Sequence, residues 1–329
     1  MSASTVWGGA PWTPLLQAAI AESSEAQYKR GVEQFLKWLQ DEGHPPLYTV
    51  IDIDNALCEY AWWIYCHFAG RGRSRLHNAI YGIEHYLPRT EKQLVLARRS
   101  EKGWKKFRPP LSHPPLNWGL TCLIAEQLAR GGHPGAAVAV LVGVDCYLRI
   151  SEIGSLRACD ISVLEGAVRD GTNTLVSLAH CKTGDNQSVV VRRESVSGLL
   201  VGWKEYVLRE TGDPYAHLFP DPAHFRHLFT WAQRELGWST GLGGEGVRFV
   251  PHSLRHGGAS VDYISLGARR IEEILFRGRW ASMRSTRHYI QQGPALTAAA
   301  LAGVPQWQRE FGLFIGQGPR YFIPIPEWL

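Results

Sequence analysis

Several polar side chains lie where the surrounding pattern predicts a protein core. Arg149 closely follows the most apolar stretch of the chain, Gly135–Val144, and an arginine placed there needs an anionic partner. His252 and Arg255 lie three residues apart, so on a helix they share one face and can converge on one ligand. Lys182 falls at the tip of a predicted hairpin. Guanidinium, ammonium and imidazole groups are the donors that a phosphate group requires.

Each of these residues also has an ordinary structural interpretation. Arg149 and Glu152 can form an ion pair that only stabilises the fold, and Lys182 can be a solvated charge on a hairpin. His252 can belong to a capped helix N-terminus, and we expect the adjacent His256 to point elsewhere. Taken one at a time, the residue types therefore leave both interpretations open.

The order of these residues resembles the pattern of the tyrosine recombinase (phage integrase) family. In that family an Arg, a hairpin Lys, His-x-x-Arg, a His or Trp, and a nucleophilic Tyr follow one another. Six residues match the pattern here, although the last two taken singly are typical of a core: Arg149, Lys182, His252, Arg255, Trp280 and Tyr289. The fifth position is Trp rather than His, which is most similar to Cre, a member of this family.

The resemblance implies a metal-independent transesterification that uses no cofactor. Tyr289 would attack a DNA phosphodiester and conserve the bond energy in a covalent 3′-phosphotyrosine, which a free 5′-hydroxyl later attacks. Arg149 and Arg255 would each present a planar guanidinium to the non-bridging oxygens. Trp280 would donate its indole N–H to the same phosphate.

The remaining roles also follow from the resemblance. Lys182 would protonate the leaving 5′-oxygen, as the hairpin lysine of the family does. His252 would act either as the proton acceptor for Tyr289 or as a donor to the phosphate, and the residues do not separate these roles. Glu152 would lie behind the site and orient Arg149 or His252.

The elements that position these residues predict a mainly α fold with a small three-stranded antiparallel sheet. Apolar residues at helical spacing predict four helices in the first third: Leu15–Gln40, Asp54–Phe68, Arg71–Leu87 and Glu91–Phe107. These make residues 1–108 an all-α domain, which resembles the core-binding, DNA-clamping domain of the family. Four prolines within 109–115 predict a semi-rigid linker.

Residues 116–329 are predicted to form an α+β catalytic domain with a C-terminal tail. Leu116–Gly131 and an apolar helix, Ala136–Leu148, precede three predicted strands, and further helices follow. The strands are Ile161–Val168, Thr174–Ala179 and Ser188–Arg192, joined by turn sequences at 170–173 and 182–186. The tail over 306–329 is aromatic and proline-rich, and its pattern assigns it no element.

Basic residues are concentrated in one block of the chain. Residues 71–110 carry 11 Lys or Arg against 3 Asp or Glu, whereas residues 1–70 carry 3 against 8. A block this basic predicts contact with the backbone of double-stranded DNA, although a solvated basic helix pair would show the same composition. The predicted DNA contacts are Arg71, Arg73, Arg75, Arg98, Arg99, Lys102, Lys105 and Lys106.

Composition limits the other classes of function. The six cysteines are scattered and lack paired spacing, and Cys58, Cys66 and His67 share a predicted helix without a second ligand pair, so we predict no metal site. The longest apolar run is too short to span a bilayer, and no signal peptide is visible. We therefore expect an intracellular protein without a membrane partner, in the cytoplasm and nucleoid or, for a eukaryotic element, in the nucleus.

The resemblance leaves more than one activity open. A site-specific recombinase that exchanges strands between two sites would act as a homotetramer on DNA. A type IB topoisomerase would use the same residues to relax supercoils, and a hairpin telomere resolvase is usually larger. A catalytically silent DNA-binding protein of the same fold would have no reason to keep all six residues.

Overall fold

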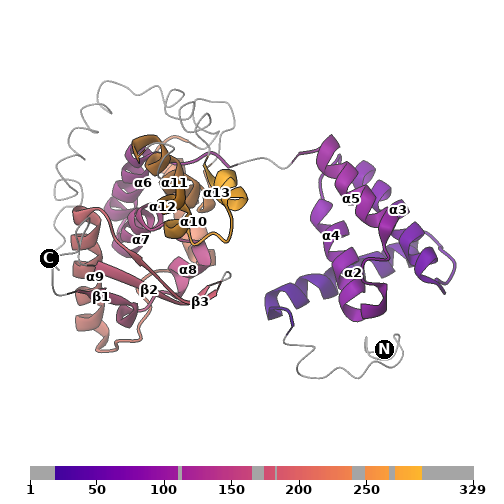
Figure 1. The fold of residues 1–329 in the computed structure, drawn as a ribbon, viewed down its shortest axis with the longest axis horizontal. Coiled ribbons are helices and arrows are strands. Elements are labelled where there is room, and N and C mark those ends of the chain that lie inside the picture. The colour runs from indigo at the N-terminus through magenta and orange to yellow at the C-terminus, as the bar shows by residue number, and fades with distance from the viewer. Residues whose placement is uncertain are drawn as a thin grey trace. The chain divides into compact units, whose positions relative to one another are not determined.

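The chain divides into two compact units, Met1–Leu111 and Ser112–Leu329. The computed structural model describes residues 19–109, 113–164, 174–181, 184–238, 249–266 and 271–290 (Figure 1). The predicted linker lies partly outside the described residues, and the tail over 306–329 lies wholly outside them.

The described part of the N-terminal unit is entirely helical. Four helices and one 3₁₀ turn follow one another: α2 (Glu22–Asp41), α3 (Val50–His67), α4 (Arg73–Tyr86), η2 (Pro88–Thr90) and α5 (Val95–Phe107). Helix α4 packs against α2, α3 and α5, and α3 packs against α5. The shared core is rich in aromatic side chains, with Phe35, Trp38 and Tyr60 almost completely buried. These rings contact one another and bury a large apolar area for a unit of this size.

Side-chain caps set the starts of two of these helices. Thr49 and Asp52 form a reciprocal capping box, so α3 begins at Val50, four residues before the predicted start. Asp54 is buried within α3, and its carboxylate accepts the backbone N–H groups of Leu96 and Ala97 at 2.9 Å each. This contact satisfies the first turn of α5, which begins at Val95 rather than at the predicted Glu91.

The C-terminal unit surrounds one buried helix, α7 (Pro134–Asp145). Every residue of α7 from Gly135 to Asp145 is buried, which is why its sequence is apolar on all sides. Helices α6 (Trp118–Arg130), α9 (Glu194–Thr211) and α11 (His252–Leu266) pack around it. The remaining helical elements are α8 (Ile150–Ser155), η3 (Ala158–Asp160), α10 (Pro222–Glu235), α12 (Ile271–Gly278) and α13 (Met283–Tyr289).

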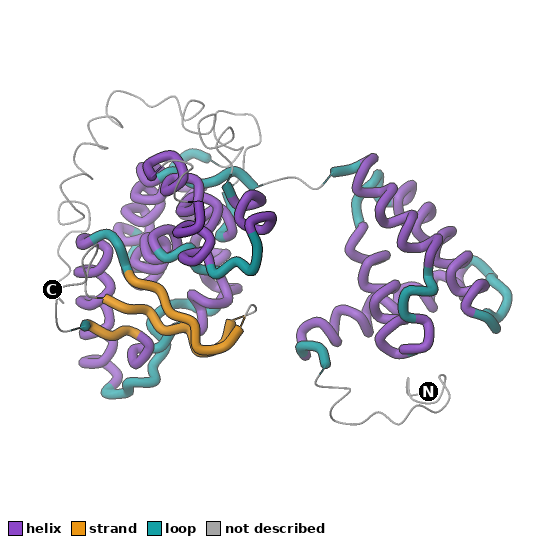
Figure 2. Tube along the Cα trace, in the orientation of Figure 1, coloured by secondary structure: helices purple, strands orange, loops and turns teal. Residues whose placement is uncertain are grey.

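A three-stranded antiparallel sheet lies at one side of this unit (Figure 2). The order is β1 (Ile161–Val163), β2 (Thr174–Cys181), β3 (Gly184–Val190), with Ile161 opposite Val176 and Leu175 opposite Val190. Strand β3 begins at Gly184, so part of the predicted turn over 182–186 is paired strand instead. The predicted mainly α fold with a small three-stranded antiparallel sheet is thus confirmed.

Candidate active site

Arg149 lies at the turn that follows the buried helix. We predicted that this helix runs to Leu148, but α7 ends at Asp145, and the backbone of Tyr147 turns through a positive φ of 49°. Arg149 then becomes the first residue before α8. Its backbone N–H donates to Glu152 Oε2 at 2.8 Å, and its Nη1 donates to Oε1 at 2.5 Å. The structural ion pair is therefore present, but it uses only part of the donor capacity of the Arg149 guanidinium.

Helix α11 brings Arg255 toward this turn by a close backbone approach. A Cβ on Gly257 would lie 2.1 Å from the carbonyl oxygen of Leu116, and one on Gly258 would lie 2.2 Å from that of Val144. Only glycine fits at either position, because any side chain would collide with a backbone that cannot move aside. Gly257 therefore allows α11 to lie against the segment before α6, and Gly258 allows it to lie directly on α7.

Arg255 is the largest fully buried side chain of the described residues. Its Nη1 donates to the carbonyl oxygen of Tyr147 and its Nη2 to that of Gly278, and Glu152 Oε2 lies 3.9 Å from Nη1. Burial, followed by the nearby Arg149 guanidinium, lowers the pKa of Arg255 to about 10. Arg255 thus remains protonated at neutral pH and provides a fixed positive charge.

Trp280 and Tyr289 pack over the face of this guanidinium. Trp280 follows α12, and Tyr289 is the last residue of α13, which Ser282 caps. The two rings stack with centroids 4.7 Å apart, and the Arg255 Cζ lies 4.9 Å from the Trp280 ring and 5.2 Å from the Tyr289 ring. The indole N–H of Trp280 is buried and donates to no acceptor among the described residues.

Two histidines of α11 complete the cluster. The ring centroids of His252 and Tyr289 lie 5.4 Å apart, and those of His256 and Tyr289 lie 4.8 Å apart. His256 Nδ1 lies 3.2 Å from the carbonyl oxygen of Tyr289, to which Ser260 Oγ also donates at 3.4 Å. The expectation that His256 points elsewhere is wrong. Its ring stacks on the Tyr289 ring, and its Nδ1 contacts the backbone carbonyl group at the end of α13.

Five of the six predicted catalytic residues therefore come together with Glu152, while the sixth lies outside the described residues. Lys182 follows Cys181, whose backbone pairs with Gly184 in the hairpin, and nothing further is described of it. Arg279 was not among the predicted residues, yet its Nη2 donates to Glu152 Oε2 at 2.8 Å. Asp145 was not predicted either, although a carboxylate at the end of a wholly apolar helix indicates buried basic partners.

Glu152 is the only buried carboxylate that the three arginines of this cluster share among the described residues. Burial by itself would raise the pKa of Glu152. Arg279, the backbone N–H of Arg149, and the guanidinium groups of Arg255 and Arg149 together outweigh burial and lower it. Glu152 is therefore ionised at neutral pH, and three guanidinium groups around one carboxylate leave the cluster electropositive.

The basic block of the N-terminal unit separates into internal and exposed charges. Arg98 donates from Nη2 to the buried Glu84 at 2.5 Å and from Nε at 3.2 Å, and its Cζ lies 5.0 Å from the Tyr81 ring. Arg73 and Lys105 each lie 3.5 Å from the buried Glu101. Lys105 is nevertheless exposed, as are the other predicted DNA contacts: Arg71, Arg75, Arg99, Lys102 and Lys106.

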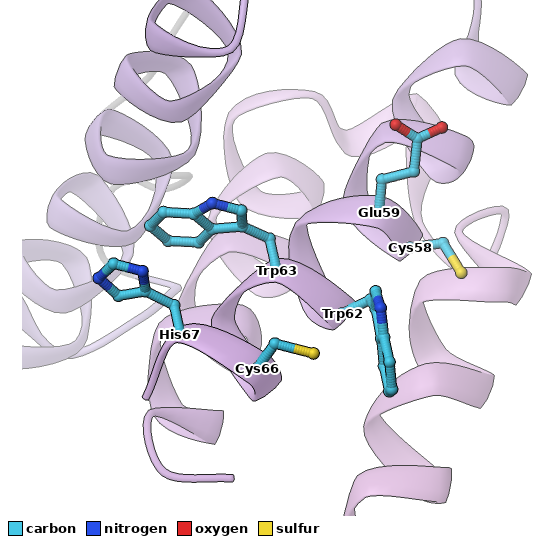
Figure 3. A pocket seen from close by; sticks show the side chains of 6 residues that line it. All are labelled: Cys58, Glu59, Trp62, Trp63, Cys66 and His67. Atoms are coloured by element: carbon cyan, nitrogen blue, oxygen red, sulfur yellow. The ribbon is translucent and has the colours of Figure 1, made fainter. Parts of the chain in front are cut away.

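Helix α3 carries a hollow of about 670 Å³ on its outer side (Figure 3). Its lining consists of Cys58, Glu59, Trp62, Trp63, Cys66 and His67. The Trp63 and His67 rings stack with centroids 4.7 Å apart. Within the described residues, no group of three or more His, Cys, Asp or Glu side chains is arranged to hold a metal ion. We assign this hollow no part in the chemistry of the cluster.

Solved structures of known proteins share the fold of this chain. No protein-family model matches the chain, and no curated protein matches its sequence. A lambda integrase dimer bound to a COC' core site matches with a TM-score of 0.56 at 12% identity, covering 84% of this chain and 74% of that chain. The Tn1549 transposon integrase in complex with transposon right end DNA matches with a TM-score of 0.59 at 11% identity, covering 86% and 94%.

The same transposon integrase in complex with circular intermediate DNA has a TM-score of 0.55 at 14% identity, covering 86% of this chain and 95% of that chain. The chain therefore has the fold of the tyrosine recombinases and integrases, as the resemblance implied. Among the described helices, none is both long and apolar enough to cross a membrane.

Proposed function

We propose that this chain is a site-specific DNA recombinase of the tyrosine type. It would cleave and rejoin DNA strands through a covalent 3′-phosphotyrosine. The observation that carries the proposal is that the Tyr289 ring lies 5.2 Å from the Arg255 Cζ of the same chain, beside Arg149 and Trp280. Structures of integrases in complex with DNA share the fold, which supports double-stranded DNA as the partner.

In the proposed cleavage, the phenolic oxygen of Tyr289 forms a bond to the phosphorus and the bond from phosphorus to the 5′-oxygen breaks. The electron pair of that bond goes to the 5′-oxygen, which takes a proton from Lys182. The phenolic proton of Tyr289 passes to His252. Charge that develops on the non-bridging oxygens is stabilised by Arg149 and Arg255, each by about 3–4 kcal/mol in analogy with oxyanion-hole donors.

The observed packing corresponds to a resting form in this proposal. Arg255 is fully buried, and the rings of Trp280 and Tyr289 lie over it. A phosphate reaches the guanidinium only when the Tyr289 ring moves from this place. Arg255 Nε and Trp280 Nε1 are buried and have no hydrogen-bond partner among the described residues, so both are donors for that phosphate.

Covalent capture on a nicked duplex tests the proposal. A nick close to the cleaved phosphate leaves only a short fragment that carries the released 5′-hydroxyl. This fragment diffuses away, so the covalent intermediate accumulates. The wild-type chain is expected to form an SDS-resistant complex with DNA in the presence of EDTA. A Tyr289→Phe chain lacks the attacking oxygen and is expected to form none, while it binds the same duplex as tightly as wild type.

The same assay separates the alternatives. A silent DNA-binding protein would capture nothing with either chain, and that result would end the proposal. A topoisomerase would capture DNA and relax a supercoiled plasmid but would not exchange strands between two sites. A recombinase exchanges them, and we propose that it does so as a homotetramer on paired sites, which the mass of the complex with two sites would report.

DNA affinity is proposed to depend on the exposed basic residues of the N-terminal unit. We leave Arg98 out of this surface because its charge is matched by Glu84. Replacing Arg71 and Arg75 with Gln is expected to weaken binding and to reduce the slope of log Kd against log salt by about 0.9 for each phosphate that the chain no longer neutralises. Lys37→Gln is the control, since Lys37 is an exposed lysine of the same unit that pairs with Asp41.

Binding measured at several salt concentrations decides the outcome. An unchanged slope in the Arg71→Gln, Arg75→Gln chain would show that this end of α4 lies away from DNA. An equal weakening with Lys37→Gln would show only a general effect of net charge.

A further inference from the structure

A buried arginine with an unfavourable backbone conformation adjoins Trp280. Within the described chain, four non-glycine residues have positive φ, and two of them, Tyr147 at 49° and Arg279 at 54°, lie beside the cluster. Residues other than glycine rarely adopt this backbone conformation, because their Cβ approaches the backbone too closely. Such a conformation persists where surrounding contacts hold it, and these places are often functional.

The contacts of the Arg279 side chain hold it in this position. Only 5% of the side chain is exposed. Its Nη1 donates to the carbonyl oxygens of Cys146 and Arg277 at 3.3 and 3.2 Å. Its Nη2 donates to the carbonyl oxygen of Tyr147 at 3.3 Å and to Glu152 Oε2 at 2.8 Å. Arg279 thus connects the turn before Arg149 with the segment that carries Trp280.

Both strained residues also determine where Arg255 lies. The carbonyl oxygen of Tyr147 accepts from Arg255 Nη1, and that of Gly278, which directly precedes Arg279, accepts from Nη2. The two unusual backbone conformations therefore aim the two carbonyl groups that hold the Arg255 guanidinium.

The two carboxylate oxygens of Glu152 accept hydrogen bonds from different arginine donors. Oε1 accepts from Arg149 Nη1 at 2.5 Å, and Oε2 accepts from the backbone N–H of Arg149 at 2.8 Å and from Arg279 Nη2 at 2.8 Å. Arg255 Nη1 remains 3.9 Å from Oε2 and donates to a backbone carbonyl instead. Without Arg279, Oε2 would lose its charged partner, and Arg255 would be drawn toward it and away from the Trp280 and Tyr289 rings.

We infer that Arg279 is a positioning residue for the proposed DNA cleavage: it occupies Glu152 Oε2 so that Arg149 and Arg255 keep the separation that a phosphate requires. The inference rests on the proposed function. Arg279 donates to Glu152 and to the carbonyl oxygen of Tyr147, which also accepts from Arg255, so it acts through these groups.

Three substitutions of Arg279 test this inference on the full-length chain. Arg279→Gly removes the side chain at a φ that glycine adopts without strain, so folding is not penalised by the backbone. Arg279→Lys keeps a positive charge that can reach Glu152. Arg279→Gln keeps most of the side-chain volume without charge and serves if the glycine chain does not fold. Arg209→Gln, which removes an exposed charge of the same unit, is the matched control.

The measurements are the single-turnover rate of covalent capture on the nicked duplex and the Kd for the intact duplex. Arg279→Gly and Arg279→Gln are expected to lower the capture rate by up to about 100-fold, as displaced catalytic groups do, with Kd unchanged. Arg279→Lys is expected to recover most of the missing rate. Arg209→Gln is expected to capture DNA at the wild-type rate.

Each contrary outcome has a distinct meaning. Capture at the wild-type rate by the glycine and glutamine chains would overturn the inference while leaving the proposed function intact. A lysine chain as slow as the glycine chain, or a fall in affinity that matches the fall in rate, would also overturn it, because the charge on Glu152 would then not be what matters. A wild-type chain that captures nothing would overturn the proposed function, and this inference with it.

Discussion

Replacing Arg255 with lysine is expected to slow covalent capture of DNA by roughly 10²- to 10³-fold, the effect typical of a removed transition-state donor. Arg255 donates to two backbone carbonyls from its two terminal nitrogens and still has an unpaired Nε–H. A lysine ammonium has one nitrogen and cannot bind the carbonyls of Tyr147 and Gly278 while it also contacts a phosphate. The single-turnover capture rate on the nicked duplex measures this effect.

A methionine at the same position separates catalysis from stability. Arg255→Met leaves two buried carbonyls and Glu152 without this partner, so the free energy of unfolding of the C-terminal unit is expected to fall by about 3–5 kcal/mol. Arg255→Lys keeps the charge, and its free energy of unfolding is expected to fall by less. If the lysine chain captured DNA as fast as wild type, Arg255 would be a structural residue and the phosphate would have to bind elsewhere.

Residue type and order predicted which distant side chains lie together, while their catalytic roles stay predictions. Arg149, Arg255, Trp280 and Tyr289 come from segments far apart in the chain, yet the structure places them within one cluster. The resemblance to the tyrosine recombinase pattern grouped these residues, whereas the residue types alone indicate only that each buried charge has a partner. The same resemblance predicted that Glu152 would lie behind the site.

The hydrophobic pattern of the sequence could not predict the backbone geometry around the cluster. The apolar residues Cys146, Tyr147 and Leu148 extend the hydrophobic run of α7, so periodicity predicts a helix to Leu148. The chain instead turns at Tyr147 through a positive φ. A tyrosine in the sequence gives no signal of such a turn. Arg279 is hidden for the same reason, since a left-handed arginine is recognised only from the contacts that hold it.

Pairing between distant residues was the second limit. Arg98 was predicted to contact DNA as part of the basic block, but it binds Glu84, which lies 14 residues earlier in the chain on another helix. His256 was expected to face away from the site, although it lies four residues after His252 and therefore shares a helical face with it. The end of α13 packs across that face of α11, and only the tertiary structure reveals it.

A second buried charge cluster connects the hairpin to the helices that carry Trp280 and Tyr289. Asp145, at the end of α7, has a fully buried side chain. Its Oδ1 accepts from Arg193 Nη1 at 2.6 Å, and its Oδ2 accepts from the backbone N–H of Arg192 at 2.7 Å and lies 3.3 Å from Arg277 Nη2. Arg277 also donates from Nη1 to the carbonyl oxygen of Val190 at 2.9 Å. One carboxylate thus joins α7, the end of β3 and α12.

Asp145→Asn is therefore expected to lower the free energy of unfolding of the C-terminal unit by about 3–5 kcal/mol, because it leaves Arg193 and Arg277 without their anion in a buried setting. Protection of the α7 amides against hydrogen exchange reports this unit alone and is expected to fall by about 10²- to 10³-fold, at about 1.4 kcal/mol for each factor of ten. Glu210→Gln is the control: Glu210 pairs with Arg209 on the surface at 3.8 Å, and such pairs contribute little. Asp145 connects the end of the hairpin strand β3 to α12, the helix before Trp280. Unchanged protection in Asp145→Asn would therefore mean that apolar packing alone holds these elements together. The geometry of the cluster would then depend on apolar contacts rather than on this buried carboxylate.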